Sequence, residues 1–395
     1  MVTDIKKATD CLQLANKLSQ ELMKITVNPD ASSKTLTEQL DRLRNSGLSN
    51  LLISQEYGGY GETWFNAFKV VREVSKADGS VGQLLGYHYA NSTIPRLFGT
   101  VEQNAYFCIQ SVKHKWFWGD VINPQDPNLI LTPYENNFLL NGVKKFNREL
   151  KGSDIMVVTG IRSDLNNILF AVVPSDRQGI SIDRGWNFEG QRQTDNDSVI
   201  FDNVLIRQDE ILGNPDSQEL PSPFATMVTC LYQLIFANLY LGIALGALEA
   251  AKQYTKSTTQ PWILSPTARA TQDPYIIEQY GDLWIDLSAT QSHLDCVASL
   301  FQKAWNKEEA LTVAERGEVA VAIASAKVLS TRVGLNVTSK IFEVMGATAD
   351  TSQYQFDRYW RNIRTYTLHD PVVYKVHEVG NWILNGQIPI FTLYT

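Results

Sequence analysis

The spacing of apolar residues changes twice along this chain, and these changes limit the folds that it can adopt. Up to residue 117, apolar residues recur every three or four positions, which is the period of an amphipathic helix. From Trp118 the period falls to two, as in half-buried strands, and after a Pro-rich connection the helical period returns and lasts to the end. The sequence therefore predicts an α+β fold with a helical domain at 1–117, a β domain at 118–214 and a helical bundle at 215–395.

Both the bundle and the β domain contain more local signals. Four periodic stretches are long enough to form the helices of a four-helix bundle, near 223–257, 273–306, 312–346 and 371–385. In the β domain, Asn141-Gly142 separates two short apolar runs. Because Asn-Gly supplies the positive φ angles of a type I′ turn, we expect a hairpin here, within a small antiparallel sheet.

Composition excludes several classes of function. The formal net charge is −7 and no run of Lys or Arg exceeds two residues, so a nucleic-acid role is not expected. The most hydrophobic stretch, 231–251, is interrupted by Gln233, Asn238 and Glu249, which favours a buried bundle helix over a membrane span.

The cysteines and histidines bear on compartment and on metal binding. The four cysteines lie far apart with no C-x-x-C pair, a pattern typical of a reduced, cytoplasmic protein. The five histidines show no spacing typical of metal ligands, so no metal site is expected.

Two histidines are candidates for chemistry. His88 lies in an aromatic helix, where a structural histidine with satisfied ring nitrogens and a catalytic one are both open interpretations. His369 precedes Asp370-Pro371, which looks like a helix start. The positive end of a helix dipole favours a neutral imidazole that donates a hydrogen bond or accepts a proton, although a plain helix boundary is an equally open interpretation.

Six stretches of the chain together resemble one family. They are LLGYHYANS (84–92), NGVKKFN (141–147), KGSD (151–154), GQRQTDNDSVIFDNV (190–204), QLIFANLYLGIALGALEAA (233–251) and FDRYWRNIRTYTLHDPVVYKVHEVGNWILNG (356–386). The chain resembles flavin-dependent monooxygenases of the acyl-CoA dehydrogenase fold, in the dibenzothiophene and dibenzothiophene-sulfone monooxygenase group, with related sulfur-acquisition oxidoreductases. The resemblance implies an N-terminal helical domain, a central β-barrel, a C-terminal four-helix bundle and a homotetramer.

The resemblance also implies a cofactor and site residues. Reduced FMN, supplied by a separate NAD(P)H-dependent flavin reductase, would react with O2 and transfer oxygen to a small hydrophobic substrate, for which organosulfur compounds are candidates. His88 and His369 match the family's catalytic histidines near the flavin, and Trp186 matches a tryptophan that packs near its ring. Because the flavin carries the oxygen chemistry, the histidines would position oxygen and relay a proton.

Four positions depart from the family at its flavin contacts. Asp120 replaces an asparagine, Arg148 replaces a small residue near the flavin ring, and Gln260 and Thr348 replace two arginines near the flavin phosphate. We expect Asp120 and Arg148 to contact the cofactor, with Glu149 and Asp120 as the candidate acidic partners of Arg148.

These departures leave other functions open. One is a protein of the same fold that does not bind flavin in the usual way and acts as a binding or scaffold protein, or as a flavin-independent catalyst. An acyl-CoA dehydrogenase is less favoured, because it needs a carboxylate base. The only carboxylate near His369 is Asp370, which we expect to cap a helix.

Overall fold

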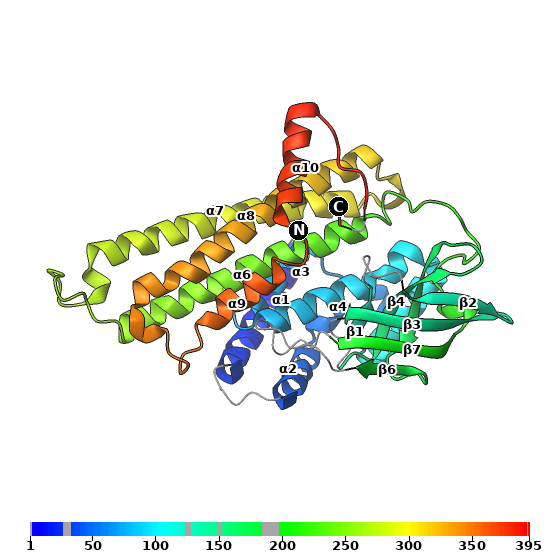
Figure 1. Cartoon of the computed structure of the whole chain (residues 1–395), viewed down its shortest axis with the longest axis horizontal. Coiled ribbons are helices and arrows are strands. Elements are labelled where there is room, and N and C mark those ends of the chain that lie inside the picture. Colours follow the sequence, from blue (N-terminus) through cyan, green and yellow to red (C-terminus); the bar gives the residue numbers. More distant parts are fainter. Residues whose placement is uncertain (1, 27–32, 123–127, 148–151, 184–196, 393) are drawn as a thin grey trace.

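A long helical body and a sheet lie side by side in this protein, with the sheet at one end (Figure 1). The computed structural model describes residues 2–26, 33–122, 128–147, 152–183, 197–392 and 394–395. The predicted succession of helices, strands and helices is confirmed. The first change falls between His114 and Trp118, and the second between Ile206 and Met227.

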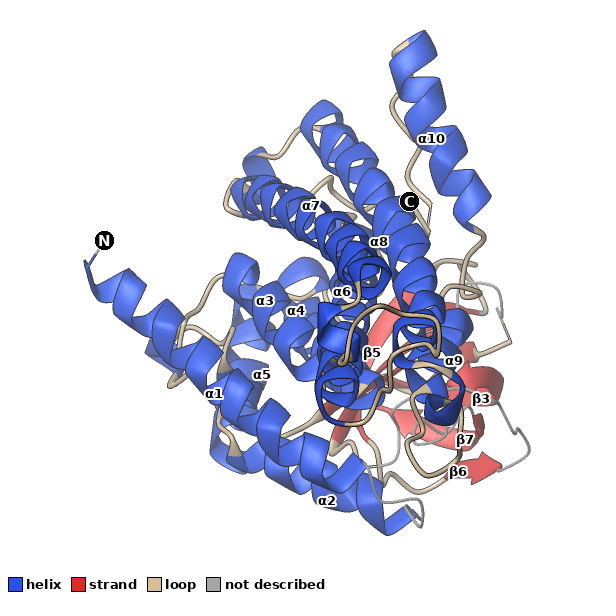
Figure 2. Ribbon diagram, turned by 90° about the vertical axis from the view of Figure 1, so that its left-hand side faces the viewer, coloured by secondary structure: helices blue, strands red, loops and turns tan. Residues whose placement is uncertain are grey.

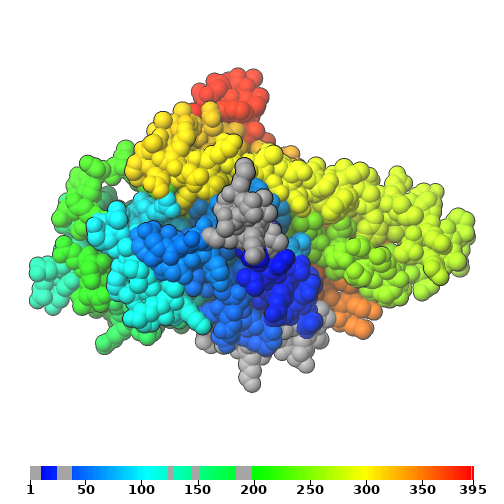
Figure 3. All heavy atoms as spheres, turned by 180° about the vertical axis from the view of Figure 1, so that it is seen from behind, coloured from blue at the N-terminus to red at the C-terminus, as the bar shows by residue number. Residues whose placement is uncertain are grey.

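The N-terminal region is helical and carries clear capping signals. Asp78 caps its fourth helix by accepting hydrogen bonds from the backbone N–H groups of Ser80 and Val81. Thr100 and Gln103 form a capping box at the start of the fifth. The helices are α1 (Val2–Thr26), α2 (Ser33–Asn45), α3 (Trp64–Ser75), α4 (Gly79–Phe98) and α5 (Val101–His114), with short 3-10 turns η1 (Leu48–Asn50) and η2 (Gln55–Tyr57). Seen from behind, these helices cover the middle of the molecule, between the sheet and the far end of the bundle (Figure 3).

The central region forms one seven-stranded sheet with the order β1-β4-β2-β3-β7-β6, and β5 pairs with β4. The strands are β1 (Trp118–Val121), β2 (Ile130–Tyr134), β3 (Asn137–Asn147), β4 (Ile155–Arg162), β5 (Ile168–Pro174), β6 (Ile180–Asp183) and β7 (Asp197–Ile206). The expectation of a wholly antiparallel sheet is wrong, because β4 pairs in parallel with both β1 and β2. This pairing places the end of β1 beside the middle of β4.

The prediction of a hairpin turn at Asn141-Gly142 is also wrong. Strand β3 continues through both residues, and its register with β7 shifts between Leu140 and Gly142, which marks a β-bulge. Gly142 has φ +133°, and a Cβ atom there would lie 2.0 Å from the carbonyl oxygen of Asn128. The Asn141 side-chain oxygen accepts a hydrogen bond from the backbone N–H of Asn203 at 2.8 Å. The Asn-Gly pair therefore serves a close backbone approach within a strand rather than a chain reversal.

The C-terminal region begins after the 3-10 turn η3 (Gln208–Glu210), and its long helices lie side by side in the helical body (Figure 1). The long helices are α6 (Met227–Ser257), α7 (Pro274–Trp305) and α8 (Val313–Met345), and the shorter helices α9 (Asp357–Tyr366) and α10 (Val372–Asn385) follow them. The 3-10 turns of this region are η4 (Ala270–Gln272), η5 (Glu308–Ala310) and η6 (Ala347–Ala349). Helix α10 projects outward from the bundle (Figure 2).

Helix α6 lies at the centre of the fold. It is long and apolar enough to cross a membrane, but 83% of its most hydrophobic window is buried inside the chain, so it is a core helix. Gly242 and Gly246 let α3 approach closely, since a Cβ atom at either would lie 2.4 Å or less from the carbonyl oxygens of Arg72 and Lys76. One apolar core therefore joins the N- and C-terminal helices, while the sheet has its own core.

Candidate active site

Helix α4 presents an aromatic and polar face to α6. Tyr87 and Asn91 are four residues apart and therefore lie on the same side of the helix. The Tyr87 ring makes edge contacts with Tyr232 at 5.1 Å and with Phe236 at 5.8 Å. These three rings form a wall between α4 and the first three turns of α6.

A chain of hydrogen bonds continues from this wall to the sheet. The Tyr232 hydroxyl donates to Asn91 Oδ1 at 2.5 Å, and Asn91 Nδ2 donates to Asp120 Oδ2 at 2.9 Å. Asn91 is fully buried and Asp120 nearly so. The two contacts fix the orientation of the Asn91 amide and join α6, α4 and β1 at one place.

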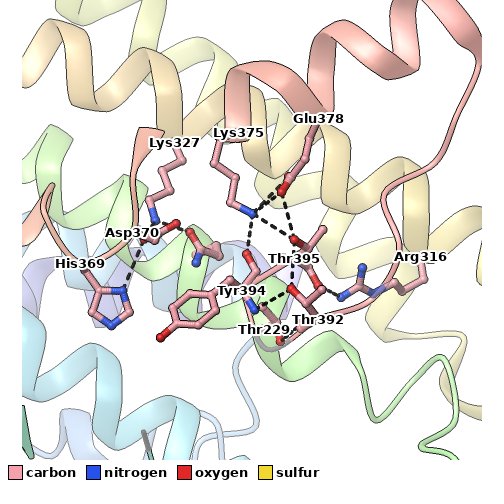
Figure 4. Close-up of polar contacts among 11 residues, drawn as sticks. Thr229, Arg316, Lys327, His369, Asp370, Lys375, Glu378, Thr392, Tyr394 and Thr395 are labelled. Atoms are coloured by element: carbon pink, nitrogen blue, oxygen red, sulfur yellow. Dashed lines mark hydrogen bonds and ion pairs between the residues drawn. The ribbon is translucent and has the colours of Figure 1, made fainter. Parts of the chain in front are cut away.

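His369 lies at the other side of the aromatic wall, between α9 and α10. Its ring centroid is 5.1 Å from that of Phe236 and 6.0 Å from that of Tyr394, and its side chain is 32% exposed. Its Nδ1 is 3.4 Å from Asp370 Oδ1 (Figure 4). His369 is thus a partly accessible imidazole that is held beside a carboxylate.

Asp370 does not cap a helix, contrary to expectation. Helix α10 begins with Pro371 at its N-cap and has no side-chain cap. Asp370 instead forms a buried ion pair with Lys327 of α8, and Lys327 also donates to Gln233 of α6 (Figure 4). Burial raises the pKa of Asp370, but the contacts with His369 and Lys327 outweigh burial and hold its pKa well below the usual range. Asp370 is therefore ionised.

His88 lies on a different side of α4 from Tyr87 and Asn91. Its Nδ1 accepts a hydrogen bond from the backbone N–H of Trp118 at 3.1 Å, and its Nε2 lies 2.8 Å from the carbonyl oxygen of Ser49. The ring is 1% exposed and stacks on Phe117. Burial lowers the pKa of His88 to about 4, which keeps the imidazole neutral with its proton on Nε2. Both ring nitrogens thus bind backbone groups, one at the start of β1 and the other in η1.

The other residues predicted from the sequence are placed differently or are not described. Trp186 and Arg148 lie outside the described residues. Gln260 follows the end of α6, and Thr348 in η6 contacts the Tyr254 hydroxyl at 2.9 Å. Tyr254 is 22 residues from Tyr232 on α6, about 33 Å along the helix. Within one chain, Gln260 and Thr348 therefore lie far from Asp120 and His369.

Several site residues were not predicted. Tyr87 and Asn91 lie on either side of His88 in the sequence and are four residues apart, as are Tyr232 and Phe236. Because residues four apart share one face of a helix, these two spacings could have indicated the facing surfaces. Lys327 also carried a signal, because it is a lone charge in a stretch of α8 composed of small and apolar residues. Their partners lie far away in the sequence, and only the fold brings them together.

Comparison with known proteins identifies the family. The acyl-CoA dehydrogenase N-terminal domain matches residues 14–114, and the acyl-CoA dehydrogenase C-terminal domain matches residues 234–373, together more than half of the chain. The chain belongs to the acyl-CoA dehydrogenase family. Within this family, the predicted resemblance to monooxygenases is confirmed by relatives that match almost the whole chain.

Three of these relatives are informative. A "Probable FMNH2-dependent monooxygenase", SfnC of Pseudomonas putida, is 38% identical over 97% of this chain and 97% of its own length. The methanesulfinate monooxygenase MsuC of Pseudomonas fluorescens has a TM-score of 0.92 and 36% identity, covering 97% of this chain and 99% of its own. The FMN-bound structure of TdsC, a dibenzothiophene monooxygenase of Paenibacillus sp. A11-2, has a TM-score of 0.91 and 36% identity, covering 98% of this chain and 100% of its own.

Proposed function

We propose that this protein is a two-component, FMNH2-dependent monooxygenase that oxidises a small hydrophobic substrate, with organosulfur compounds as the leading class. The observation that carries the proposal is the arrangement of His369 against the aromatic wall of Tyr87, Tyr232 and Phe236. Relatives that span the whole chain are named for FMNH2 dependence or for organosulfur substrates, which supports this choice. A separate NAD(P)H-dependent flavin reductase would supply the reduced flavin.

The described residues fit a flavin. Gln83, Tyr87 and Asn91 follow one another at four-residue steps along α4, and the Gln83 amide is fully buried with no partner among the described residues. A buried amide without a partner is costly unless a ligand or water satisfies it. The polar edge of a flavin ring both donates and accepts hydrogen bonds, and its planar body suits an aromatic wall.

The chain's own residues would position the reactants and move a proton. Bound reduced FMN supplies the electrons that activate O2. The aromatic wall would exclude water and bind the apolar substrate, and Asp120 with Asn91 would contact the cofactor from the sheet side. His369 would hold or relay a proton at Nε2, while His88 would act as a positioning residue that fixes the start of β1, two residues before Asp120.

An α,β-dehydrogenation is less consistent with this geometry. It needs a carboxylate base that can accept a proton from carbon. Asp370, the carboxylate beside His369, is held by a buried lysine, and its lowered pKa makes it a poor base.

We further propose a cytoplasmic homotetramer. Apolar side chains are strongly exposed on α10 and in the connection after α6, including Ile383 at 71%, Leu384 at 83% and Ile263 at 86%. Exposed apolar patches of this kind mark subunit contacts. A tetramer would also let a neighbouring chain bring Gln260 and Thr348 to the flavin. The cysteines form no disulfide in the part of the chain that the structure describes, in keeping with a reducing compartment.

The decisive experiment supplies the purified protein with FMN, NADH, a flavin reductase and 18O2, with dibenzothiophene and methanesulfinate as separate probes. Mass spectrometry should find one 18O atom in the product, and omission of the reductase should abolish it. If no flavin is retained in either redox state and no product forms, the protein of the same fold that does not use flavin becomes the better description.

A further inference from the structure

A buried lysine lies behind His369, on the far side of Asp370 (Figure 4). Lys327 is 1% exposed, and its Nζ donates to Asp370 Oδ1 and to the Gln233 side-chain oxygen. Its Nζ also lies 5.6 Å from the centroid of the Phe236 ring, which belongs to the aromatic wall. Burying a cation is costly, and an ion pair recovers this cost only with additional hydrogen bonds.

Asp370 connects this lysine to the imidazole. Its Oδ1 takes the contacts from both Lys327 and His369 Nδ1, while its Oδ2 has no hydrogen-bond partner among the described residues. Since a carboxylate can only accept a hydrogen bond, the contact requires the proton of neutral His369 to be on Nδ1. The lone pair is then on Nε2, the nitrogen that would accept a proton.

Other charged groups face the ion pair from neighbouring elements. Lys375 and Glu378 of α10 act on Lys327 in opposite directions, and Tyr394 lies beside Asp370. Burial lowers the pKa of Lys327 to about 8, and Asp370 counteracts burial, so the lysine remains charged at neutral pH. Lys375 and Glu378 also contact each other at 3.0 Å, so among the described residues Asp370 is the acidic group that pairs with Lys327.

We propose that Lys327 and Asp370 are positioning residues for His369: the carboxylate fixes the imidazole tautomer, and the lysine keeps that carboxylate ionised while the imidazole stays neutral. When His369 Nε2 takes up a proton, the imidazolium is stabilised by Asp370 and the proton can be returned. The arrangement follows the logic of a carboxylate that orients a catalytic histidine. The role of Lys327 and Asp370 in catalysis rests on the proposed function, whereas their effect on the protonation of His369 does not.

The two residues should shift the titration of His369 in opposite directions. Without the Asp370 charge, the imidazolium loses its counter-ion, so Asp370→Asn should move the midpoint to lower pH. Without Lys327, the buried carboxylate keeps a charge-balancing partner only if His369 is protonated, so Lys327→Met should move the midpoint to higher pH. A general disruption of packing would not produce shifts of opposite sign.

The test uses diethyl pyrocarbonate, which acylates neutral imidazole, with peptide mapping to follow His369 as a function of pH in the flavin-free protein. Exposed His114 provides an internal reference, and Lys340→Met, which removes an exposed lysine on α8, is the matched control. The midpoint for acylation of His114 should be the same in every variant, and the midpoint of His369 in Lys340→Met should equal that of the wild type. If Lys327→Met does not fold, the double variant Lys327→Met/Asp370→Asn removes both charges and should show the midpoint of Asp370→Asn.

Unchanged midpoints in Asp370→Asn, or shifts of the same sign in both single variants, would overturn the proposal. In the oxygenation assay, Asp370→Asn should lower kcat about tenfold or more and leave KM within about twofold. If no oxygenation is found with any probe while the opposite shifts remain, the proposed function fails and the assignment of the positioning pair stands.

Discussion

The backbone N–H of Trp118 donates a hydrogen bond to Nδ1 of His88 at 3.1 Å, and this contact ties helix α4 to the first strand of the sheet. The other ring nitrogen binds the Ser49 carbonyl, so one imidazole joins η1, α4 and β1. Asn91, three residues later on α4, binds Asp120 of the same strand. Stability and the placement of the site therefore depend on adjacent parts of one helix.

Replacement of His88 should affect stability first. His88→Ala leaves a buried N–H and a buried carbonyl without partners, and we expect the free energy of unfolding to fall by about 3 kcal/mol. His88→Asn keeps an acceptor for Trp118 and should lose less. Urea denaturation measures both, and a wild-type midpoint for His88→Ala would contradict the positioning role.

The same histidine should make stability depend on pH. Its folded-state pKa of about 4 lies below the ordinary value of 6.5, so protonation favours the unfolded chain. The contribution of neutral His88 to the free energy of unfolding is therefore fully present above pH 6.5 and is lost as the pH falls towards 4. The loss should be about 2 kcal/mol between pH 7 and pH 5. His88→Asn should lack this part of the slope. Equal slopes in the two proteins would assign the titration to other groups.

Replacement of His369 should affect turnover without a large loss of stability. We expect His369→Ala to lower kcat by ~10²-fold, as for a positioned acid or base. Because the side chain is partly exposed, the free energy of unfolding should change by less than about 1 kcal/mol. Reductase-coupled assays and urea denaturation of the same preparation separate the two effects. Full turnover would remove His369 from the mechanism.

We expect replacement of the Asn91 amide by a carboxylate to destabilise the protein. Asn91→Asp would place two buried acids within hydrogen-bond distance of each other, and we expect it to cost about 2–4 kcal/mol at pH 7. The cost should shrink at pH 5, where the pair can share one proton. In contrast, Asp120→Asn still offers an oxygen to Asn91 and should fold normally. Thermal unfolding at both pH values tests the comparison, and an equal cost at each pH would contradict it.

The oligomer should depend on α10. Leu384→Glu places a charge on a side chain that is 83% exposed in one chain, and we expect it to dissociate the tetramer at micromolar concentration. Ile168→Glu, at an exposed isoleucine on β5, is the matched control and should leave the assembly intact. Light scattering reports the mass of each. A tetramer that survives Leu384→Glu would place the subunit contacts elsewhere.

The sequence allowed the long helices to be predicted within a few residues, because their apolar period extends over many turns. It failed at Asn141-Gly142, since a bulge and a type I′ turn both favour Asn-Gly, and only the register with β7 separates them. His88 could be selected from the sequence as a candidate site residue. Its hydrogen-bond partners could not be predicted, because they are backbone atoms, which have no sequence signature. The pairing of Lys327 with Asp370 joins residues 43 positions apart and depends on how α10 follows α9.

Helix α6 also has a consequence for how proteins of this kind can change in length. It carries Tyr232 and Phe236 near its start and Tyr254 near its end, with no break between Met227 and Ser257. Inserting or deleting one residue between these groups would rotate one end by about 100° relative to the other and disturb both sets of contacts. The connection from Thr258 to Asp273 imposes no such rotation. Insertions and deletions should therefore be purged from the helix and be tolerated in the part of the connection after Ile263, because Gln260 and Ile263 are proposed to meet a neighbouring chain.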